Sequence, residues 1–145
     1  KEEMEAVLQK VNLLGFLQTQ NGLQTELLEK AGNLSGGQCQ RLVIARALLR
    51  SDSAVYIFDE AASNIDVESE ELIMNVIHEL AKTKTVLLIS HRLANVVQSD
   101  QIYFLKNGTI CERGTHAELM EQNGAYRHLY DSQMVLENYG KQGNA

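Results

Sequence analysis

Residues 55–89 read VYIFDEAASNIDVESEELIMNVIHELAKTKTVLLI. The stretch begins with an apolar run at 55–58 that is rich in strand-forming residues, and it ends with a second such run at 85–89. Between the runs, Asp66 stands where a helix N-cap is expected, and apolar residues follow it at helical spacing. A strand, a helix and a strand over this length predict one right-handed βαβ unit of a parallel sheet, with both strands buried.

Helices are predicted on the N-terminal side of this unit. The first 30 residues carry a helical stripe of apolar side chains, with breaks expected at Gly15 and at Asn21-Gly22. Ser35 and Gln38 have the spacing of a capping box, which predicts that a second helix begins here and ends near residue 50.

A hairpin and two helices are predicted on the C-terminal side. The Asn-Gly pair at 107–108 is a favourable turn for a hairpin over 101–111. A Thr-x-x-Glu pattern at Thr115 starts one helix, and a last helix is expected from about Ala125. We find no internal repeat and no low-complexity tract.

Composition excludes several classes of protein. The chain has 145 residues, enough for one domain, and its 13 basic and 19 acidic residues give a formal charge of −6. This balance argues against a nucleic-acid surface. Cys39 and Cys111 fit neither a disulfide framework nor a CxxC metal site, so a reducing, cytoplasmic setting is expected. No apolar run approaches the ~20 residues that cross a bilayer as a helix.

The first residues already belong to a helical pattern. The apolar stripe follows Lys1-Glu2-Glu3 directly, with no Met and no turn before it. We therefore expect the chain to begin inside a larger domain. The alternative is a complete small protein from which a tag has been removed.

Residues 35–38, Ser-Gly-Gly-Gln, lie at the predicted start of a helix. A helix N-terminus has unpaired backbone N–H groups and a partial positive charge, so it attracts anions. Glycines allow the backbone to approach phosphate oxygens closely, and the serine hydroxyl adds a donor. Taken alone, the same residues also fit a capped helix that follows a flexible turn.

Acidic side chains follow the first predicted strand. Asp59 and Glu60 stand at its C-terminal end, where ligands bind in open α/β sheets. An aspartate there suits a hydrated Mg²⁺ ion, and a neighbouring glutamate can orient or deprotonate an attacking water. A solvated pair of acids at the end of a strand is the alternative interpretation.

His91 follows the second predicted strand, whose end should share an edge with the end of the first. A histidine there can donate to a phosphate oxygen or hold a water, although a lone histidine is more often structural. The stretch 63–66 by itself is a loop with an N-cap aspartate. The remaining histidines have no ligand partner at metal spacing and receive no role: His78, His116 and His128.

The order and spacing of these features resemble the C-terminal half of an ATP-binding cassette, the motor of ABC transporters. LSGGQ at Leu34–Gln38 resembles the family's signature, and VYIFDE at Val55–Glu60 resembles its Walker B strand. SNID at Ser63–Asp66 resembles the D-loop, and His91 stands at the position of the switch histidine. The resemblance extends over roughly residues 1–130 and implies an α/β fold. That fold is the C-terminal part of a P-loop NTPase (RecA-like) cassette, a parallel sheet with flanking helices plus part of the helical subdomain.

The resemblance implies a role for each motif in ATP hydrolysis. Glu60 and His91 are the implied catalytic residues, and Asp59 is implied to hold Mg²⁺ through water. Cassettes of this family pair head to tail, so the signature is implied to bind the γ-phosphate of an ATP held by the partner cassette. The implied nucleotide-contacting residues of the signature and the D-loop are Ser35, Gly36, Gly37, Gln38, Ser63 and Asp66.

The chain contains no Walker A loop, which each cassette of the family also needs. Gly140-Lys141 is followed by Gln142 and does not fit the pattern. We therefore predict that this chain alone does not hydrolyse ATP. The implied partners are a second cassette, the N-terminal half of its own cassette and a transmembrane domain, with no nucleic acid. The implied location is the cytoplasmic side of the cell membrane.

The subtype is argued from the loop before the signature. Thr25–Lys30, TELLEK, partly resembles the loop of exporters that contacts the transmembrane helices, with Leu28 in place of a glycine. We expect an exporter. The alternatives are a soluble ABC ATPase of chromosome maintenance or translation, and a non-catalytic cassette remnant, which intact Glu60 and His91 disfavour.

The resemblance also divides the chain by role. Residues 1–50 are expected to form part of the helical subdomain that carries the signature, and residues 51–135 the C-terminal part of the RecA-like core. Residues 136–145 are expected to be a flexible tail.

Overall fold

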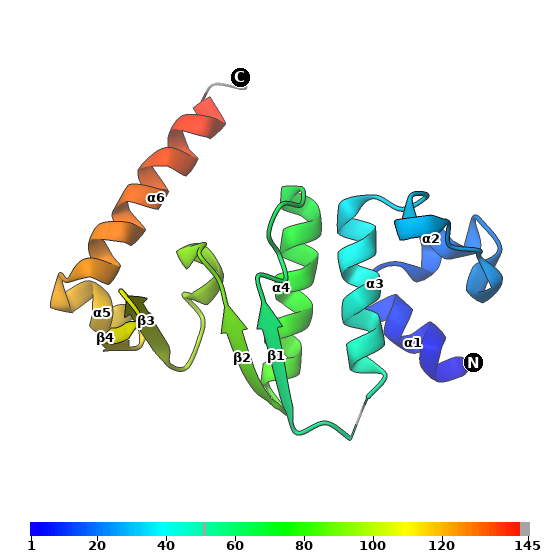
Figure 1. The fold of residues 1–145 in the computed structure, drawn as a ribbon, viewed down its shortest axis with the longest axis horizontal. Helices are drawn as coiled ribbons and strands as arrows, with labels where there is room; N and C mark the ends of the chain where they lie inside the picture. Colours follow the sequence, from blue (N-terminus) through cyan, green and yellow to red (C-terminus); the bar gives the residue numbers. More distant parts are fainter. Residues whose placement is uncertain (51, 143–145) are drawn as a thin grey trace. The chain divides into compact units, whose positions relative to one another are not determined.

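A computed structural model describes residues 1–50 and 52–142 of the chain (Figure 1). Ser51, near the expected end of the signature helix, and residues 143–145 of the expected tail lie outside this description. The helices, with 3₁₀ helices marked η, are α1 (Glu2–Lys10), α2 (Leu14–Gln18), η1 (Gly22–Gln24), η2 (Glu29–Ala31), α3 (Gly36–Leu48), α4 (Val67–Ala81), η3 (Leu93–Val96), α5 (His116–Gln122) and α6 (Ala125–Gln142). The strands are β1 (Val55–Asp59), β2 (Thr85–Ile89), β3 (Ile102–Lys106) and β4 (Thr109–Gly114).

The predicted strand–helix–strand unit is confirmed. β1 and β2 pair in parallel from Val55 opposite Thr85 to Asp59 opposite Ile89, and α4 connects them. The carboxyl ends of both strands therefore lie at one edge, as the sequence predicted. Asp66 caps α4, because its carboxylate accepts a hydrogen bond from the Ser69 backbone N–H at 2.8 Å.

Only one face of the β1–β2 sheet is buried, which corrects the expectation of fully buried strands. Tyr56 and Phe58 point into the core and are 7% and 6% exposed, whereas Val55 and Ile57 are 55% and 65% exposed. Successive side chains of a strand point to opposite faces, and the core helices of this chain cover one face only. The core on that face combines Tyr56 and Phe58 with Ile73, Met74 and Ile77 of α4 and with Ile44 and Ala45 of α3.

The first 30 residues are less helical than the sequence predicted. The break falls at Asn12, whose φ of 53° lies in the left-handed region, and not at Gly15, which lies inside α2. Asparagine tolerates this conformation better than most residues, so it ends α1 without a glycine. Between α2 and α3 the chain contains only short 3₁₀ turns, and Lys30 and Ala31 have positive φ.

The C-terminal elements follow the sequence prediction closely. β3 and β4 form an antiparallel hairpin, and Asn107 and Gly108 have φ of 52° and 75°, as a tight Asn-Gly turn requires. Thr115 caps α5 with the expected capping box. The carboxylate of Glu112 accepts from the backbone N–H groups of Ala125 and Tyr126, at 2.6 and 3.0 Å, and thereby supplies an acidic cap to α6.

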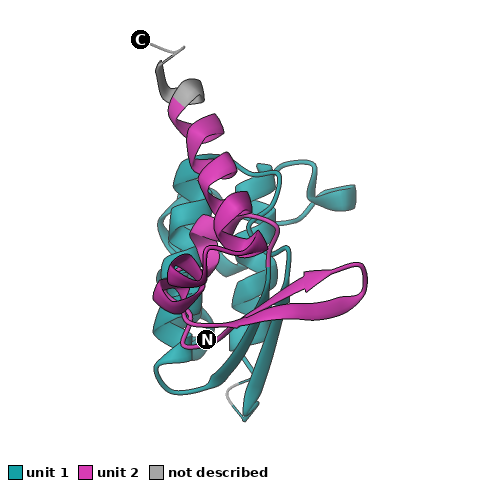
Figure 2. Ribbon diagram, turned by 90° about the vertical axis from the view of Figure 1, so that its left-hand side faces the viewer, with its two compact units in different colours: residues 1–89 teal, residues 90–145 magenta. Residues whose placement is uncertain are grey.

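The chain divides into two compact units, residues 1–89 and 90–145 (Figure 2). The first contains the helices α1 to α4 with the β1–β2 sheet, and the second contains η3, the β3–β4 hairpin, α5 and α6. Within the first unit, α3 packs beside α4. α6 continues to Gln142, so residues 136–142 of the expected tail are helical. The division of the chain by role stays a prediction.

Candidate functional site

The signature tip, residues 35–38, is an exposed and well-formed helix N-terminus. The Ser35 Oγ accepts from the Gln38 backbone N–H at 3.2 Å, and the Gln38 side chain accepts from the Ser35 N–H at 2.9 Å. This is the predicted capping box, at the start of a 13-residue helix. Ser35 and Gly36 are exposed, and a Cβ added at Gly36 would meet no atom within 4 Å. The tip is therefore open to a ligand.

Gly37, in contrast, is buried against the start of α4. A Cβ added at Gly37 would lie 2.6 Å from Ser69 Cβ and 3.1 Å from Asp66 Oδ2, and it would also collide with Ser69 Oγ. The second signature glycine thus allows α3 and α4 to approach closely. Residues of two separate motifs, Gly37 of the signature and Asp66 at the end of stretch 63–66, are packed together within one unit.

This packing predicts that substitution of the two adjacent glycines affects protein stability differently. Gly37→Ala is expected to lower the free energy of unfolding by about 1–3 kcal/mol, the usual cost of overpacking. Gly36→Ala is expected to stay within about 1 kcal/mol of the parent, because Ala has the better helix propensity and open space around it. Thermal unfolding of the full-length protein measures both. The double change Gly37→Ala with Ser69→Gly should recover part of the loss, and equal stability of the two single variants would contradict the packing.

The acidic pair lies at the edge of the sheet, as predicted. Asp59 is the last residue of β1 and is exposed, and Glu60 follows it half-buried. The Glu60 N–H donates to the Ile89 carbonyl at 3.0 Å, which extends the pairing with β2 by one residue. The Glu60 carbonyl accepts from the Ser63 N–H at 3.0 Å and from the Ser63 hydroxyl at 2.9 Å. These bonds hold Glu60 at a φ of 52°, an uncommon conformation for this residue type and one that is concentrated at functional sites.

Stretch 63–66 joins the acidic pair to α4. Ser63 closes the turn that begins at Glu60, and Asp66 caps the helix. The hydrogen bond from the Ser69 backbone N–H holds the pKa of the Asp66 carboxyl below its usual value, with a smaller contribution from the Arg41 guanidinium. Asp66 therefore stays ionised at neutral pH and stabilises α4 in that form. This contribution is present above the ordinary carboxyl pKa and is lost as the pH falls through the lowered one.

His91 belongs to the second unit and is exposed. Its backbone carbonyl accepts from the Gln133 side-chain amide of α6 at 2.8 Å. The other predicted site residues lie in the first unit, whereas His91 lies in the second; those of the first unit are Ser35, Gly36, Gly37, Gln38, Asp59, Glu60, Ser63 and Asp66.

Two residues that support the signature were missed in the sequence. The Arg41 guanidinium donates to the Asn12 carbonyl at 2.9 Å and to the Gly37 carbonyl at 3.3 Å, which ties the end of α1 to the tip of α3. The Asn33 side chain donates to the Glu26 carbonyl at 3.0 Å and accepts from the Leu28 N–H at 3.1 Å. Asn33 directly precedes the signature motif, so its two hydrogen bonds connect the exporter-like loop 25–30 to the start of that motif.

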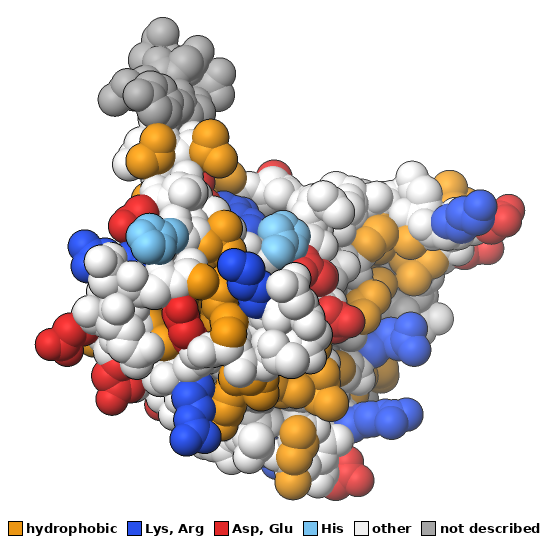
Figure 3. Space-filling view, turned by 60° about the vertical axis from the view of Figure 1, so that its left-hand side comes forward, with side chains coloured by type: hydrophobic (Ala, Val, Ile, Leu, Met, Phe, Trp, Pro, Cys, Tyr) orange, Lys and Arg blue, Asp and Glu red, His pale blue; other side chains and the backbone are white. Residues whose placement is uncertain are grey.

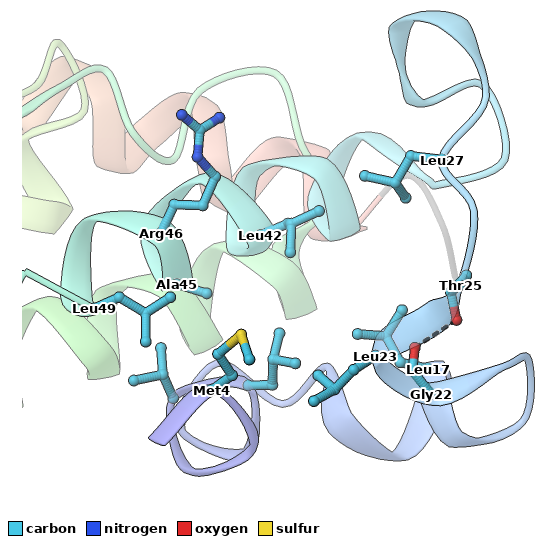
Figure 4. Close-up of a pocket in the computed structure, with 12 residues that line it drawn as sticks. Met4, Leu17, Gly22, Leu23, Thr25, Leu27, Leu42, Ala45, Arg46 and Leu49 are labelled. Carbon is cyan, nitrogen blue, oxygen red and sulfur yellow. Dashed lines mark hydrogen bonds between the residues drawn. The ribbon is translucent and has the colours of Figure 1, made fainter. Parts of the chain in front are cut away.

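An apolar hollow of about 230 Å³ lies in the first unit (Figure 4). Its walls come from α1, the 17–27 segment and α3, and Leu27 of the exporter-like loop forms part of the rim. The Thr25 hydroxyl donates to the Gly22 carbonyl at 2.6 Å and closes the turn over residues 22–25, which lines the hollow. Loop 25–30 therefore lies beside an apolar hollow.

Neither a metal cluster nor a membrane span is found in the part of the chain that the structure describes. Residues 1–50 and 52–142 contain no group of three or more His, Cys, Asp or Glu side chains arranged to hold a metal ion. Asp59 is a single exposed carboxylate, which fits Mg²⁺ because that ion keeps several waters as ligands. Over the same residues, no helix combines the length and apolar character that crossing a bilayer requires.

Exposed apolar side chains occur in both units. Hydrophobic atoms lie between acidic and basic side chains on the face drawn in Figure 3. The exposed apolar side chains of the first unit include Ile57 and Leu87 on the uncovered face of the β1–β2 sheet, at 65% and 50% exposure. Sheet faces of this kind are usually covered by further structure.

Comparisons with known proteins agree with the motifs and the fold. The family model described as ABC transporter matches residues 1–63. An uncharacterized ABC transporter ATP-binding protein of Haemophilus influenzae is 50% identical over 144 residues, which cover 99% of this chain and 26% of the relative. An ATP-dependent lipid A-core flippase of Mannheimia succiniciproducens is 47% identical over 134 residues, which cover 92% of this chain and 23% of the flippase. The solved structure of a bacterial Atm1-family ABC exporter with ATP bound matches with a TM-score of 0.81 and 31% identity, over 92% of this chain and 23% of that one.

These findings define the class: an α/β ATP-binding cassette, with a parallel strand pair flanked by helices and a signature tip packed beside the stretch that resembles the D-loop. The chain belongs to the ABC transporter family and corresponds to the C-terminal part of an exporter-like cassette. It spans about a quarter of the length of the curated relatives that it matches.

Proposed function

We propose that this chain supplies the signature, the Walker B strand and the switch histidine of an ATP-hydrolysing cassette that powers export across a membrane. The observation that carries the proposal is the contact of Gly37 with Ser69 and Asp66. It joins the signature tip and the D-loop in the unit that also holds Asp59 and Glu60. Phosphoryl transfer to water requires a metal-binding carboxylate and a base, which Asp59 and Glu60 offer to one nucleotide, and phosphate-binding groups, which the tip offers to the nucleotide of a second cassette.

Within the first unit, the two strand-end acids have different proposed roles. Glu60 is the general base that accepts a proton from the attacking water, and its rigid backbone fixes the direction of its carboxylate. Asp59, exposed at the end of β1, would hold a hydrated Mg²⁺ ion through its carboxylate. When bound, Mg²⁺ supplies positive charge to the phosphate oxygens. His91 is proposed to donate to the γ-phosphate and to orient the water.

The signature tip is proposed to serve the nucleotide of a second cassette. Ser35 and Gly37 donate to the γ-phosphate of that ATP, and Gly36 and Gln38 complete the tip. The open space at Gly36 and the exposure of Ser35 support this assignment, because a phosphate can approach the helix N-terminus there. Ser63 and Asp66 connect the tip to the acidic pair and communicate with the opposite site. The partner is therefore a second cassette, either identical or homologous.

A transmembrane domain is the second proposed partner. Loop 25–30 contacts it, and the neighbouring apolar hollow accepts an apolar side chain from it. Asn33 transmits a displacement of this loop to the signature through its two hydrogen bonds. The cassette then lies at the cytoplasmic face of the membrane. Relatives named as flippases and exporters favour this assignment over a soluble ABC ATPase or a non-catalytic remnant.

ATP hydrolysis measured on two preparations tests the proposal. The full-length protein in lipid vesicles is expected to hydrolyse ATP. Residues 1–145 alone are expected to be inactive, because their sequence has no Walker A loop. Turnover by residues 1–145 alone that Glu60→Gln abolishes would contradict the second expectation, and an inactive full-length protein that still binds ATP would favour the non-catalytic alternative.

A further inference from the structure

The loop that carries His91 is held by Gln133, which lies 42 positions after His91 in the chain. The Gln133 amide of α6 donates from Nε2 to the His91 carbonyl at 2.8 Å, and its Oε1 accepts from the Leu93 N–H at 2.9 Å. One planar amide thus fixes the backbone on both sides of Arg92. The donor and the acceptor of the amide are used at once, so the contact is specific in orientation.

A second contact reinforces the first from the next turn of α6. The Arg92 guanidinium pairs with the Glu137 carboxylate at 3.1 Å, and both side chains are about one-third exposed. Glu137 lies four residues after Gln133, so the two side chains share one face of the helix. Leu93, 5% exposed, anchors the loop from within the second unit. Because the ion pair is partly in water, its own contribution is modest.

We infer that Gln133 is a positioning residue that fixes the backbone of the switch segment, residues 91–93, and through it the His91 imidazole. The inference rests on the proposed role of His91. An exposed loop histidine can meet a phosphate oxygen reproducibly only if its main chain is held. In this chain the carbonyl of His91 itself is held, by α6. The C-terminal helix therefore contributes to the site without touching the nucleotide.

Gln133→Leu in the full-length protein tests the inference, since leucine keeps the helix and removes both hydrogen bonds. The kcat for ATP is expected to fall roughly 10- to 100-fold, as misplacement of a positioned group does, with little change in KM. Ser132→Leu is the matched control, because it introduces the same side chain at an exposed position of α6 whose hydroxyl bonds only within the helix. An unchanged kcat in Gln133→Leu, or an equal loss in Ser132→Leu, would overturn the inference.

A double-mutant cycle with His91→Ala separates positioning from general stabilisation. If Gln133 acts through His91, Gln133→Leu should lower kcat little further in the His91→Ala background. Additive losses would overturn the inference. Hydrogen exchange of the 90–96 segment, compared between Gln133→Leu and Ser132→Leu, examines the restraint without ATP and should be faster in the former. If His91→Ala retains full turnover while this exchange still differs, the proposed role of His91 fails and the restraint on the segment is supported.

Discussion

ATP turnover by the full-length protein is expected to fall about 10²- to 10⁴-fold in Glu60→Gln, the usual contribution of a positioned general base. Glutamine has nearly the same shape as glutamate but cannot accept a proton from water at neutral pH. The backbone bonds of residue 60 to Ile89 and Ser63 do not involve its side chain and should persist. Nucleotide binding should therefore survive while kcat is lost, which steady-state kinetics and an ATP-binding assay on the same preparation measure.

Glu68→Gln is the matched control for this change. Glu68 lies exposed in the first turn of α4, so its substitution removes the same charge from the same unit without reaching the end of β1. Its turnover is expected to stay within about 2-fold of the parent, as for an exposed substitution away from the site. Comparable turnover in the two variants, or parental turnover in Glu60→Gln, would remove Glu60 from the proposed role.

Local signals were sufficient to predict most of the fold. Apolar periodicity located the βαβ unit, and the spacing of short polar residues located the caps at Ser35, Asp66 and Thr115. The Asn-Gly turn at 107–108 was equally local. Each of these features depends on interactions between residues a few positions apart, so each can be predicted from a short stretch of sequence.

Features that depend on distant contacts could not be predicted in this way. The two strands were predicted to be buried because they are continuously apolar. Those residues alone do not indicate which face of the sheet the rest of the chain covers. The break after α1 was placed at Gly15 because glycine is the usual signal, whereas Asn12 adopts the left-handed conformation. The Arg41 bonds to the end of α1 stabilise that bend from a residue almost 30 positions away.

The same distinction applies to the candidate site. Motif spacing was enough to propose the acidic pair and the signature, and parallel pairing of β1 with β2 then placed the strand ends together. The contact of Gly37 with Ser69 joins two residues that lie more than 30 positions apart, and the contact of Gln133 with Leu93 spans 40 positions. Neither contact has a local signal, since nothing near Gly37 or Gln133 in the sequence indicates which distant residue each of them meets.

Ser35 has one observed role and one proposed role, which one substitution should separate. Its hydroxyl caps α3 by accepting from Gln38, and in the proposed site the same side chain donates to a phosphate of the partner's nucleotide. Removing the hydroxyl in Ser35→Ala affects both roles, and the lost cap alone lowers helix stability by about 1 kcal/mol. A variant that keeps the helix cap but repels the phosphate electrostatically is therefore more informative.

Ser35→Asp is that variant. Aspartate caps a helix as well as serine does, and its negative charge interacts favourably with the N-terminus of α3, so the unfolding temperature should be unchanged or slightly higher. The same charge would face the phosphate and cannot donate to it, so ATP turnover by the full-length protein is expected to fall about 10²-fold or more, as when a positioned donor is lost. Ser35→Thr, which keeps both a cap and a donor, should retain most of the turnover. Parental turnover in Ser35→Asp at parental stability would mean that the signature tip of this chain does not meet a phosphate at all.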